Sequence, residues 1–290
     1  MNNKIYMTYK KPVPDKVFDR WKKYNPDYEI DFSLDEDCIL FLKQHFNDYV
    51  ANLFCSIKKG MFKADLWRLC KLYVYGGVYA DVDLVPYLNL DFLDKNISFY
   101  SCLAVDGKSI FQAIMVNFSK PKNPLIFIFL LSFLLNNPYV FTNGPTYDMF
   151  NCIKYNLNNN PSIVSEKKYE LDEVKINIKI GPSKTNIKEI NLYYFPEEIN
   201  YTLKIKEHKF DDLFDFTINN NILTVKRLDA NKGWSHSHSL DICIPSKESI
   251  FLFQEKYGNE SKIISTCYVE FNSQKILDSR DEEYFKKKGW

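Results

Sequence analysis

The sequence predicts an α/β domain with a mixed, mostly parallel sheet flanked by helices and a strand-rich C-terminal part. The chain begins with a strand–helix–strand–helix pattern, which is typical of α/β sandwiches. Its 290 residues are 46% hydrophobic, enough to bury one large core. From Asn156 onward the composition shifts toward Asn, Lys and Glu, and several segments alternate as strands do.

The N-terminal elements follow from apolar spacing and from turn residues. Two prolines end the first strand, since the residue before a proline avoids the helical region. Asn25 and Pro26 close the first helix, and an Asp side chain can cap each helix start. The predicted elements are a strand at Ile5–Tyr9, a helix from Asp15, a strand at Tyr28–Phe32 and a helix from Asp35 or Asp37.

The clearest helix is Ile57–Tyr75. Its apolar residues recur at spacings of four, three and four, which makes one continuous stripe: Phe62, Leu66, Leu69 and Tyr73. Gly76 and Gly77 end the helix, because glycine tolerates the left-handed conformation that a helix C-terminus needs. A short strand at residues 78–80 then places Asp81 and Asp83 at its end.

Further elements follow downstream within one domain. They are Ile97–Leu103 as a strand, the segment Ile110–Phe118, the apolar helix Leu125–Leu135, a helix from about Thr146, and strands near residues 174–180, 192–195, 202–205 and 222–225. The apolar run of about a dozen residues is too short to span a membrane, which takes about 20. We expect one domain over 1–245 and a C-terminal extension over 246–290 packed on the same domain.

Composition excludes several classes of partner and compartment. The formal net charge is +1, so neither nucleic acid nor an anionic membrane is an expected partner. Seven cysteines without a CxxC pair predict reduced thiols. The N-terminus runs directly into the first strand and leaves no room for a signal peptide. We therefore expect a soluble intracellular protein without a transmembrane segment.

Asp81 and Asp83 are candidate metal ligands. Two carboxylates separated by one residue on an extended segment point to the same face. Mn²⁺ and Mg²⁺ prefer oxygen ligands, keep several waters and complete their shell with phosphate oxygens. Such a pair can anchor a divalent metal that neutralises a diphosphate leaving group.

Asp65 and Arg68 lie three residues apart on the predicted helix and so share one face. The spacing alone fits a surface ion pair equally well. In the functional interpretation the two side chains project over the carboxyl edge of the sheet, where open α/β sheets bind ligands. There Asp65 would accept hydrogen bonds from sugar hydroxyls, and Arg68 would hold the sugar or a phosphate.

The segment Gly60–Asp83 (GMFKADLWRLCKLYVYGGVYADVD) closely resembles the DXD sugar-binding region of glycosyltransferase family 32. The same order and intervals occur in the catalytic domain of the large glucosylating cytotoxins. Ile5–Lys10 (IYMTYK) is similar to the first strand of the family, Trp21–Tyr28 to its W…NPdy stretch, and Thr142–Pro145 (TNGP) to its T-G-P turn. The resemblance covers roughly residues 1–150, which it implies are the nucleotide-sugar core of a glycosyltransferase domain over 1–245.

The resemblance implies a GT-A (Rossmann-like) fold and a retaining hexosyltransferase. It implies a UDP- or GDP-linked sugar donor, a glycan or protein acceptor, and Mn²⁺ or Mg²⁺ as cofactor. Tyr9 would stack on the nucleotide base. The other implied nucleotide or sugar contacts are Thr8, Tyr79, Gln112, Asn143, Gly144 and Pro145. The family carries a late His…Ser-Trp segment, for which Gly233–His238 (GWSHSH) offers His236 or His238 as a metal ligand and a solvated loop as the alternative.

Two other functions stay open. The run Asp81–Val85 also fits the D-x-D-x-[TV] pattern of haloacid-dehalogenase phosphatases, although no downstream Lys and Asp-Asp motif accompanies it. A non-catalytic carbohydrate- or nucleotide-sugar-binding protein on the same scaffold is the second alternative. The replaced strand-1 tryptophan favours it, and the intact acidic residues and Arg68 oppose it.

Overall fold

The computed structural model describes residues 3–46, 48–119, 121–135, 145–157, 163–180, 189–193, 204–208, 214–219, 222–227, 238–257 and 267–279. The helices are α1 (Asp15–Tyr24), α2 (Asp35–His45), α3 (Asp48–Ser56), α4 (Gly60–Tyr75), η1 (Leu90–Phe92, 3-10), α5 (Pro124–Leu135) and α6 (Pro145–Asn156). The strands are β1 (Lys4–Thr8), β2 (Glu29–Ser33), β3 (Gly77–Ala80), β4 (Leu84–Pro86), β5 (Phe99–Leu103), β6 (Ile110–Asn117), β7 (Lys167–Leu171), β8 (Val174–Ile180), β9 (Glu189–Tyr193), β10 (Lys204–His208), β11 (Phe214–Asn219), β12 (Ile222–Arg227), β13 (His238–Ile244), β14 (Glu248–Tyr257), β15 (Cys267–Phe271) and β16 (Gln274–Ser279).

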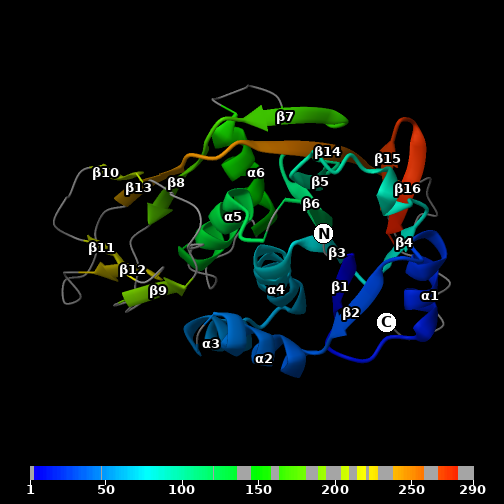
Figure 1. Ribbon diagram of the computed structural model, residues 1–290, viewed down its shortest axis with the longest axis horizontal. Coiled ribbons are helices and arrows are strands. Elements are labelled where there is room, and N and C mark those ends of the chain that lie inside the picture. The colour runs from blue at the N-terminus through cyan, green and yellow to red at the C-terminus, as the bar shows by residue number, and fades with distance from the viewer. Residues whose placement is uncertain are drawn as a thin grey trace.

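A mixed ten-stranded sheet forms the centre of the molecule (Figure 1). Its strands follow the order β2-β1-β3-β6-β5-β14-β15-β16-β4, and β7 also pairs with β14. Among its described pairings β1–β2, β1–β3 and β5–β14 are parallel, and the other six are antiparallel. The prediction of a mostly parallel sheet is therefore wrong. The connection between β5 and β6 is too short for the crossover that a parallel pair needs, so these strands form a hairpin.

Alternation along the strands sends side chains into two cores, one on each face of the sheet. Tyr6 and Tyr79 belong to the core shared with α2, α3, α4 and α5. Ile5 and Val78, their neighbours in sequence, belong to the core that includes Trp21 of α1. Figure 1 shows α4 and α5 on one side of β1 and β3, with α1, β15 and β16 on the other. The helix that carries Asp65 and Arg68 thus packs directly against the strand that leads to Asp81.

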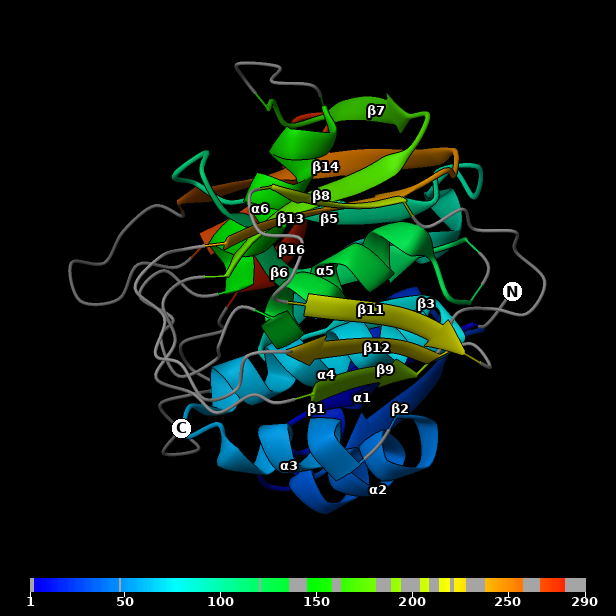
Figure 2. The same ribbon diagram turned by 90° about the vertical axis from the view of Figure 1, so that its left-hand side faces the viewer.

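The apolar run downstream forms α5, whose residues from Leu125 to Leu134 are all buried. Figure 2, viewed from the side of β8 and β13, shows α2 and α3 at the bottom, α4 above them and β7 with β14 at the top. No helix in the described part of the chain is long and apolar enough to cross a membrane. The burial of α5 agrees with the prediction of a core helix.

The C-terminal part is rich in strands, as predicted. Two three-stranded sheets, β10-β13-β8 and β11-β12-β9, account for six of these strands. Strand β14 returns to the central sheet and pairs in parallel with β5, with Ile250 opposite Phe99. Residues 248–257 are therefore a central strand of the main sheet. The boundary predicted at residue 245 stays a prediction.

One helix was missed and one begins later than predicted. Helix α4 begins at Gly60, and the main-chain N–H of Ile57 donates to the carbonyl of Leu53 at 3.2 Å, closing α3. The buried residues of α3 include Val50, Leu53 and Phe54. Val50, Leu53 and Phe54 are spaced by three and one residues, and Ile57 follows three residues later. This spacing is typical of one face of a helix, so the sequence contained the pattern that predicts α3.

A polar network ties β14 to the ends of α4 and β6. Asn123 donates through Nδ2 to Oε2 of Glu248 at 3.1 Å, while its Oδ1 accepts the N–H of Leu125 at 2.7 Å and caps α5. Asn117 donates to the carbonyl of Leu72, at the end of α4, at 3.0 Å. These side chains are buried, and an unpaired buried polar group is costly. The network therefore fixes α4 relative to β6 and β14.

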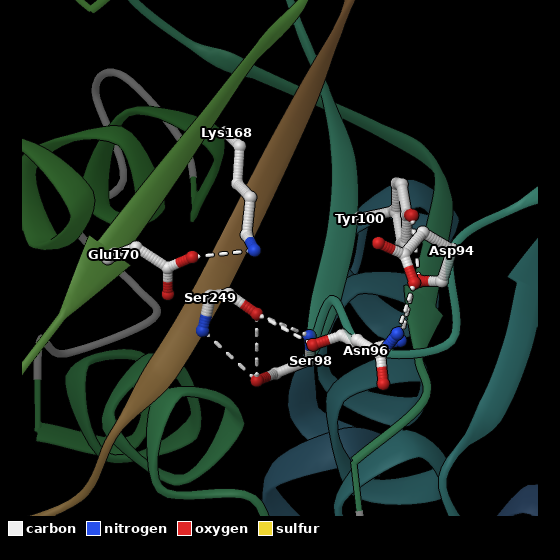
Figure 3. Close-up of polar contacts among 7 residues, drawn as sticks. All are labelled: Asp94, Asn96, Ser98, Tyr100, Lys168, Glu170 and Ser249. Carbon is white, nitrogen blue, oxygen red and sulfur yellow. Dashed lines mark hydrogen bonds and ion pairs between the residues drawn. The ribbon is translucent and has the colours of Figure 1, made fainter.

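Ser98 and Ser249 join β14 to the segment before β5 (Figure 3). The N–H of each serine donates to the hydroxyl of the other at 3.0 Å. The hydroxyl of Ser249 also donates to the carbonyl of Asn96 at 3.2 Å. Figure 3 shows the ion pair of Lys168 and Glu170 on β7 nearby, with an N–O distance of 2.7 Å. These bonds join segments about 150 residues apart and hold the parallel pair in register.

Gly76 ends α4 in a conformation that only glycine adopts readily. Its φ is +66° and its ψ is −158°, which lies outside the left-handed helical region that the sequence predicted. A Cβ atom there would lie 3.3 Å from the carbonyl oxygen of Asn117 and 3.5 Å from that of Ser119. The turn from α4 into β3 therefore favours glycine for two reasons: the positive φ of the backbone and the lack of room for a Cβ atom.

Gly76→Ala is expected to lower the free energy of unfolding by about 2 to 3 kcal/mol, because the strained φ and the close carbonyl both act against it. Urea unfolding followed by circular dichroism measures the change. Gly107→Ala is the matched control, since Gly107 also has a positive φ of +62° but nothing within 4 Å of the added Cβ. The control should cost about 1 kcal/mol. Equal losses for the two variants would show that the carbonyl contact does not matter.

Candidate active site

The Asp-Val-Asp triplet lies where β3 leaves the central sheet. The N–H of Asp81 still donates to the carbonyl of Ala113 on β6 at 2.8 Å. Strand β1 runs parallel to β3, with Tyr6 opposite Tyr79. Thr8 and Asp81, each two residues further along, therefore lie at the same edge of the sheet. The carboxyl ends of parallel strands are where open α/β sheets bind ligands.

Asp81 to Leu84 form a tight turn, which corrects the expectation of an extended segment. The N–H of Leu84 donates to the carbonyl of Asp81 at 3.1 Å, an i to i+3 bond typical of a β-turn. Val82 is 7% exposed, whereas Asp81 and Asp83 are partly exposed. The two carboxylates therefore still alternate with a buried residue, although a turn produces the pattern.

Arg68 lies behind the triplet and contacts both sides of the site. Its Nη2 lies 3.1 Å from Oδ1 of Asp65 and 3.5 Å from Oδ1 of Asp81. Its Nε donates to the carbonyl of Ala64 at 3.2 Å, and its Nη1 donates to the carbonyl of Gln112. Arg68 is 3% exposed and Asp65 is 4% exposed. The two residues form a buried pair, so the surface-pair alternative is wrong.

Tyr79 connects Arg68 to Asp81. The guanidinium carbon of Arg68 lies 4.2 Å from the centre of the Tyr79 ring, a cation–π geometry. The hydroxyl of Tyr79 donates to Oδ1 of Asp81, and Trp67 packs edge-on against the ring at 6.3 Å. Burial raises the pKa of the Tyr79 phenol well above its usual value. The phenol therefore keeps its proton and remains a donor at neutral pH.

Asp65 has a pKa raised to about 7. Burial is the largest cause; Arg68 and a hydrogen bond from the Gln112 side chain act in the opposite direction, and the charge of Asp81 adds to the rise. The second polar atom of that amide, Oε1 of Gln112, is buried without a hydrogen-bond partner among the described residues. Gln112 was predicted to contact the nucleotide or the sugar. Its carbonyl accepts from Arg68 and its side chain donates to Asp65, and its role toward a donor stays a prediction.

The charges and donor atoms of the site fit a divalent cation. Asp65, Asp81 and Asp83 carry −3 when ionised and Arg68 carries +1, which leaves −2. No group of three or more His, Cys, Asp or Glu side chains in the described ranges is arranged to hold a metal. Mn²⁺ and Mg²⁺ can take two carboxylates and fill the remaining positions with water and phosphate oxygens. Asp81 and Asp83, both partly exposed, suit that coordination.

The structure describes some of the remaining predicted residues and not others. The hydroxyl of Thr8 donates to the carbonyl of Ser33 at 2.9 Å, and the N–H of Tyr9 donates to the same carbonyl at 3.3 Å. Both residues are partly exposed at the edge that Asp81 shares. Asn143, Gly144 and His236 lie outside the described residues, Pro145 begins α6, and His238 begins β13. Their roles stay predictions.

A buried lysine on the same helix was not predicted. Lys71 is 6% exposed and pairs with Asp31 of β2 at 3.1 Å. The rings of Tyr6, Phe41, Trp67 and Tyr75 lie within 4.7 to 5.5 Å of its ammonium group. Lys71 follows Arg68 by three residues, which places both cations on one side of α4. This spacing could have predicted Lys71 from the sequence.

The chain matches a known family model over the segment that carries Asp65, Arg68, Tyr79, Asp81 and Asp83. Residues 14–101 match the model described as a glycosyltransferase sugar-binding region containing a DXD motif. The resemblance predicted from Gly60–Asp83 is thereby confirmed for this segment. The first strand, residues 5–10, and the turn at 142–145 lie outside the match, so their resemblance stays a prediction.

Similar proteins carry glycosyltransferase names. The initiation-specific alpha-1,6-mannosyltransferase of Candida albicans is 32% identical over 91 residues, which cover 28% of this chain and 24% of that protein. The chain therefore spans about a quarter of this curated relative. Two solved structures are also similar. PaToxG glycosyltransferase is 18% identical with a TM-score of 0.38, over 53% of this chain and 67% of that one. The ligand-free glycosyltransferase domain of the YGT toxin is 11% identical with a TM-score of 0.31, over 54% of this chain and 68% of that one.

Proposed function

We propose that this protein is a metal-dependent glycosyltransferase that moves a sugar from a UDP- or GDP-linked donor to a glycan or protein acceptor. One observation carries the proposal. Within the matched segment, a buried Asp65–Arg68 pair and Tyr79 support Asp81 at the carboxyl edge of β3. A DXD triplet in a loop occurs often by chance. A triplet whose first carboxylate is held by buried side chains is expected to bind a ligand.

Asp81 and Asp83 are the residues that would hold Mn²⁺ or Mg²⁺. Such an ion, when bound, stabilises the negative charge that develops on a diphosphate leaving group. Tyr79 and Arg68 orient Asp81, and Asp65 balances Arg68. Thr8 and Tyr9, at the end of the neighbouring parallel strand, are the residues that would contact the nucleotide in this proposal. The β1, β2 and β3 arrangement supports the GT-A assignment as part of the proposal.

Retention of configuration is the stereochemical outcome that we propose. A double displacement needs a carboxylate that can reach the anomeric carbon as a nucleophile. Asp65 is buried against Arg68, and Asp81 and Asp83 are assigned to the cation. We therefore favour a front-face reaction, in which the departing diphosphate oxygen accepts the proton of the acceptor hydroxyl while the glycosidic bond forms on the same face.

A panel of sugar nucleotides tests the proposal. UDP- and GDP-linked hexoses are incubated with the full chain and Mn²⁺, with release of UDP or GDP as the readout. GDP-mannose belongs in the panel because of the name of the Candida albicans relative. We expect nucleotide release with one donor, lost on chelation and restored by Mn²⁺. Release that survives chelation would contradict the metal assignment.

Two further assays separate the alternatives. A thermal shift with a donor but no nucleotide release, with or without acceptor glycans, would favour a binding protein. Phosphate release from p-nitrophenyl phosphate would favour the phosphatase. The family match supports the glycosyltransferase over the phosphatase.

A further inference from the structure

Two lysines of α4 form ion pairs on either side of the point where β2 ends. Nζ of Lys71 lies 3.1 Å from Oδ2 of Asp31, in the middle of β2. Nζ of Lys63 lies 2.6 Å from Oδ2 of Asp35, the first residue of α2. The lysines are about two turns apart along α4. Ser33, the last residue of β2, lies between the two aspartates in the chain, so one helix holds both sides of the junction of β2 and α2.

The carbonyl of Ser33 links this junction to the end of β1. It accepts the hydroxyl of Thr8 at 2.9 Å and the N–H of Tyr9 at 3.3 Å. Thr8 lies opposite Ser33 in the parallel pair of β1 and β2. Tyr9 follows at the edge of the sheet that Asp81 shares. A displacement of Ser33 is therefore expected to displace the main chain of Tyr9.

Strand β2 needs support from outside the sheet because it is an end strand. Among the described strands it pairs with β1 alone. The ammonium group of Lys71 lies among four aromatic rings, and that of Lys63 lies 4.9 Å from the centre of the Phe54 ring. The side chain of Lys71 is 8% exposed and that of Lys63 is 21% exposed. Both ion pairs are thus partly shielded from water, which makes them stronger than fully exposed pairs.

We propose that Lys63 and Lys71 are positioning residues for the nucleotide part of the donor. Through the two aspartates they fix Ser33, and through Ser33 they fix the main chain of Tyr9. Neither lysine contacts the donor. The inference rests on the proposed function, which assigns Tyr9 to the nucleotide.

The first measurement needs no donor and follows hydrogen exchange of the main-chain N–H of Tyr9 by nuclear magnetic resonance. Asp35→Asn and Asp31→Asn each break one pair and should speed this exchange by about fivefold or more. The N–H of Phe118, which donates to the carbonyl of Ser98 at 3.0 Å, reports global opening and should exchange as in the wild type. Unchanged exchange at Tyr9, or an equal rise at Phe118, would overturn the assignment for that pair.

Lys4 and Glu29 provide the matched control. They form an ion pair of 2.9 Å between the first residues of the same two strands, β1 and β2. Glu29→Gln removes this pair at the end of the strands opposite to Ser33. The control should leave both the exchange of Tyr9 and the affinity for nucleotide unchanged.

The second measurement is the affinity of the full chain for UDP and GDP, by isothermal titration calorimetry with Mn²⁺. Positioning and simple charge attraction predict opposite signs for Asp35→Asn. This variant leaves the positive charge of Lys63 unpaired, so attraction to the anionic diphosphate would strengthen binding. Loss of positioning should instead weaken binding by about fivefold or more. Tighter binding by Asp35→Asn would contradict the proposal.

Turnover gives a further readout that a purely structural role would not change selectively. With an active donor, Asp35→Asn and Asp31→Asn should raise KM for the donor and leave kcat nearly unchanged, as expected for lost binding in the ground state. A loss confined to kcat would refute a role at the nucleotide.

These measurements fail separately from the proposed function. A wild type that binds neither UDP nor GDP would count against the glycosyltransferase, whereas hydrogen exchange would still decide whether the ion pairs fix Tyr9. Should Asp31→Asn fail to fold, as judged by circular dichroism, Lys71→Met takes its place, because methionine packs well among aromatic rings. Its effect on the exchange of Tyr9 then decides for or against the Lys71 pair.

Discussion

Asp81→Asn is expected to lower Mn²⁺-dependent nucleotide release by roughly 10² to 10³-fold, because loss of one ionised ligand removes several kcal/mol of stabilisation of the leaving group. The amide keeps the shape of the side chain and can still accept from Tyr79 and Arg68, so the protein should stay folded. Asp83→Asn should act in the same direction. The measurement is kcat/KM for the active donor, with the thermal unfolding midpoint measured alongside.

Asp27→Asn is the control for these variants. Asp27 is an exposed carboxylate in the turn between α1 and β2, and it should be neutral for turnover. Full activity of both Asp81→Asn and Asp83→Asn would contradict the metal assignment. Loss of activity together with a large fall in the unfolding midpoint would instead point to a structural role for the turn.

The candidate site could be predicted because most of its contacts lie within one helix–strand unit. Asp65, Arg68, Tyr79 and Asp81 span only 17 residues, and their helical and strand periods fix which of them face each other. Gly76 allows the chain to reverse between α4 and β3 without a long loop. Local spacing therefore carried almost all of the information about the geometry of this unit.

The burial of the site could not be predicted in the same way. Whether Asp65 and Arg68 form a surface pair or a core pair depends on α2, α3 and α5, which pack around α4. The carbonyl of Gln112 meets Arg68 because β6 lies antiparallel beside β3. Every residue has a main-chain carbonyl, so a sequence pattern cannot show which carbonyl accepts a given hydrogen bond. The directions of the strands were also mispredicted, since apolar alternation is the same in parallel and antiparallel strands.

The late histidines show a different limit. They were proposed as metal ligands because the family resemblance places a His…Ser-Trp segment near the end of the chain. His236 lies outside the described residues, and His238 begins β13, where it pairs with Ile180 of β8. A substitution distinguishes the two interpretations: a ligand lost at either position should weaken Mn²⁺ binding, whereas a residue of a solvated loop should leave it unchanged.

The stability of the metal-free protein is expected to fall as pH rises from 5 to 7, and Asp65 is expected to account for a distinct part of the fall. Its pKa is about 7 in the folded protein and ordinary in the unfolded chain, so in this range the folded state holds a proton that the unfolded state has lost. The slope is about 1.4 kcal/mol per pH unit for one such group, or about 2 to 3 kcal/mol over the window. The contribution is complete below pH 4 and is lost as pH passes 7.

Urea unfolding at several pH values, without metal, measures this dependence. Asp65→Asn should flatten the curve between pH 5 and 7 by the amount that one proton contributes. Asp148→Asn is the comparison, because burial raises the pKa of Asp148 to about 6, so its contribution is lost about one pH unit lower. Identical slopes for wild type and Asp65→Asn would show that Asp65 is already ionised at pH 5.

The same proton should act on metal binding in the opposite direction. Ionisation of Asp65 changes the formal charge of the cluster from −1 to −2, so Mn²⁺ binding should strengthen as pH rises through 7 while the metal-free fold weakens. Asp65→Asn should flatten both dependences at once. A variant that flattens only the stability curve would mean that Arg68 screens Asp65 completely from the cation. Ionised Asp65 is thus expected to lower the free energy of unfolding at neutral pH and to raise the affinity of the site for Mn²⁺.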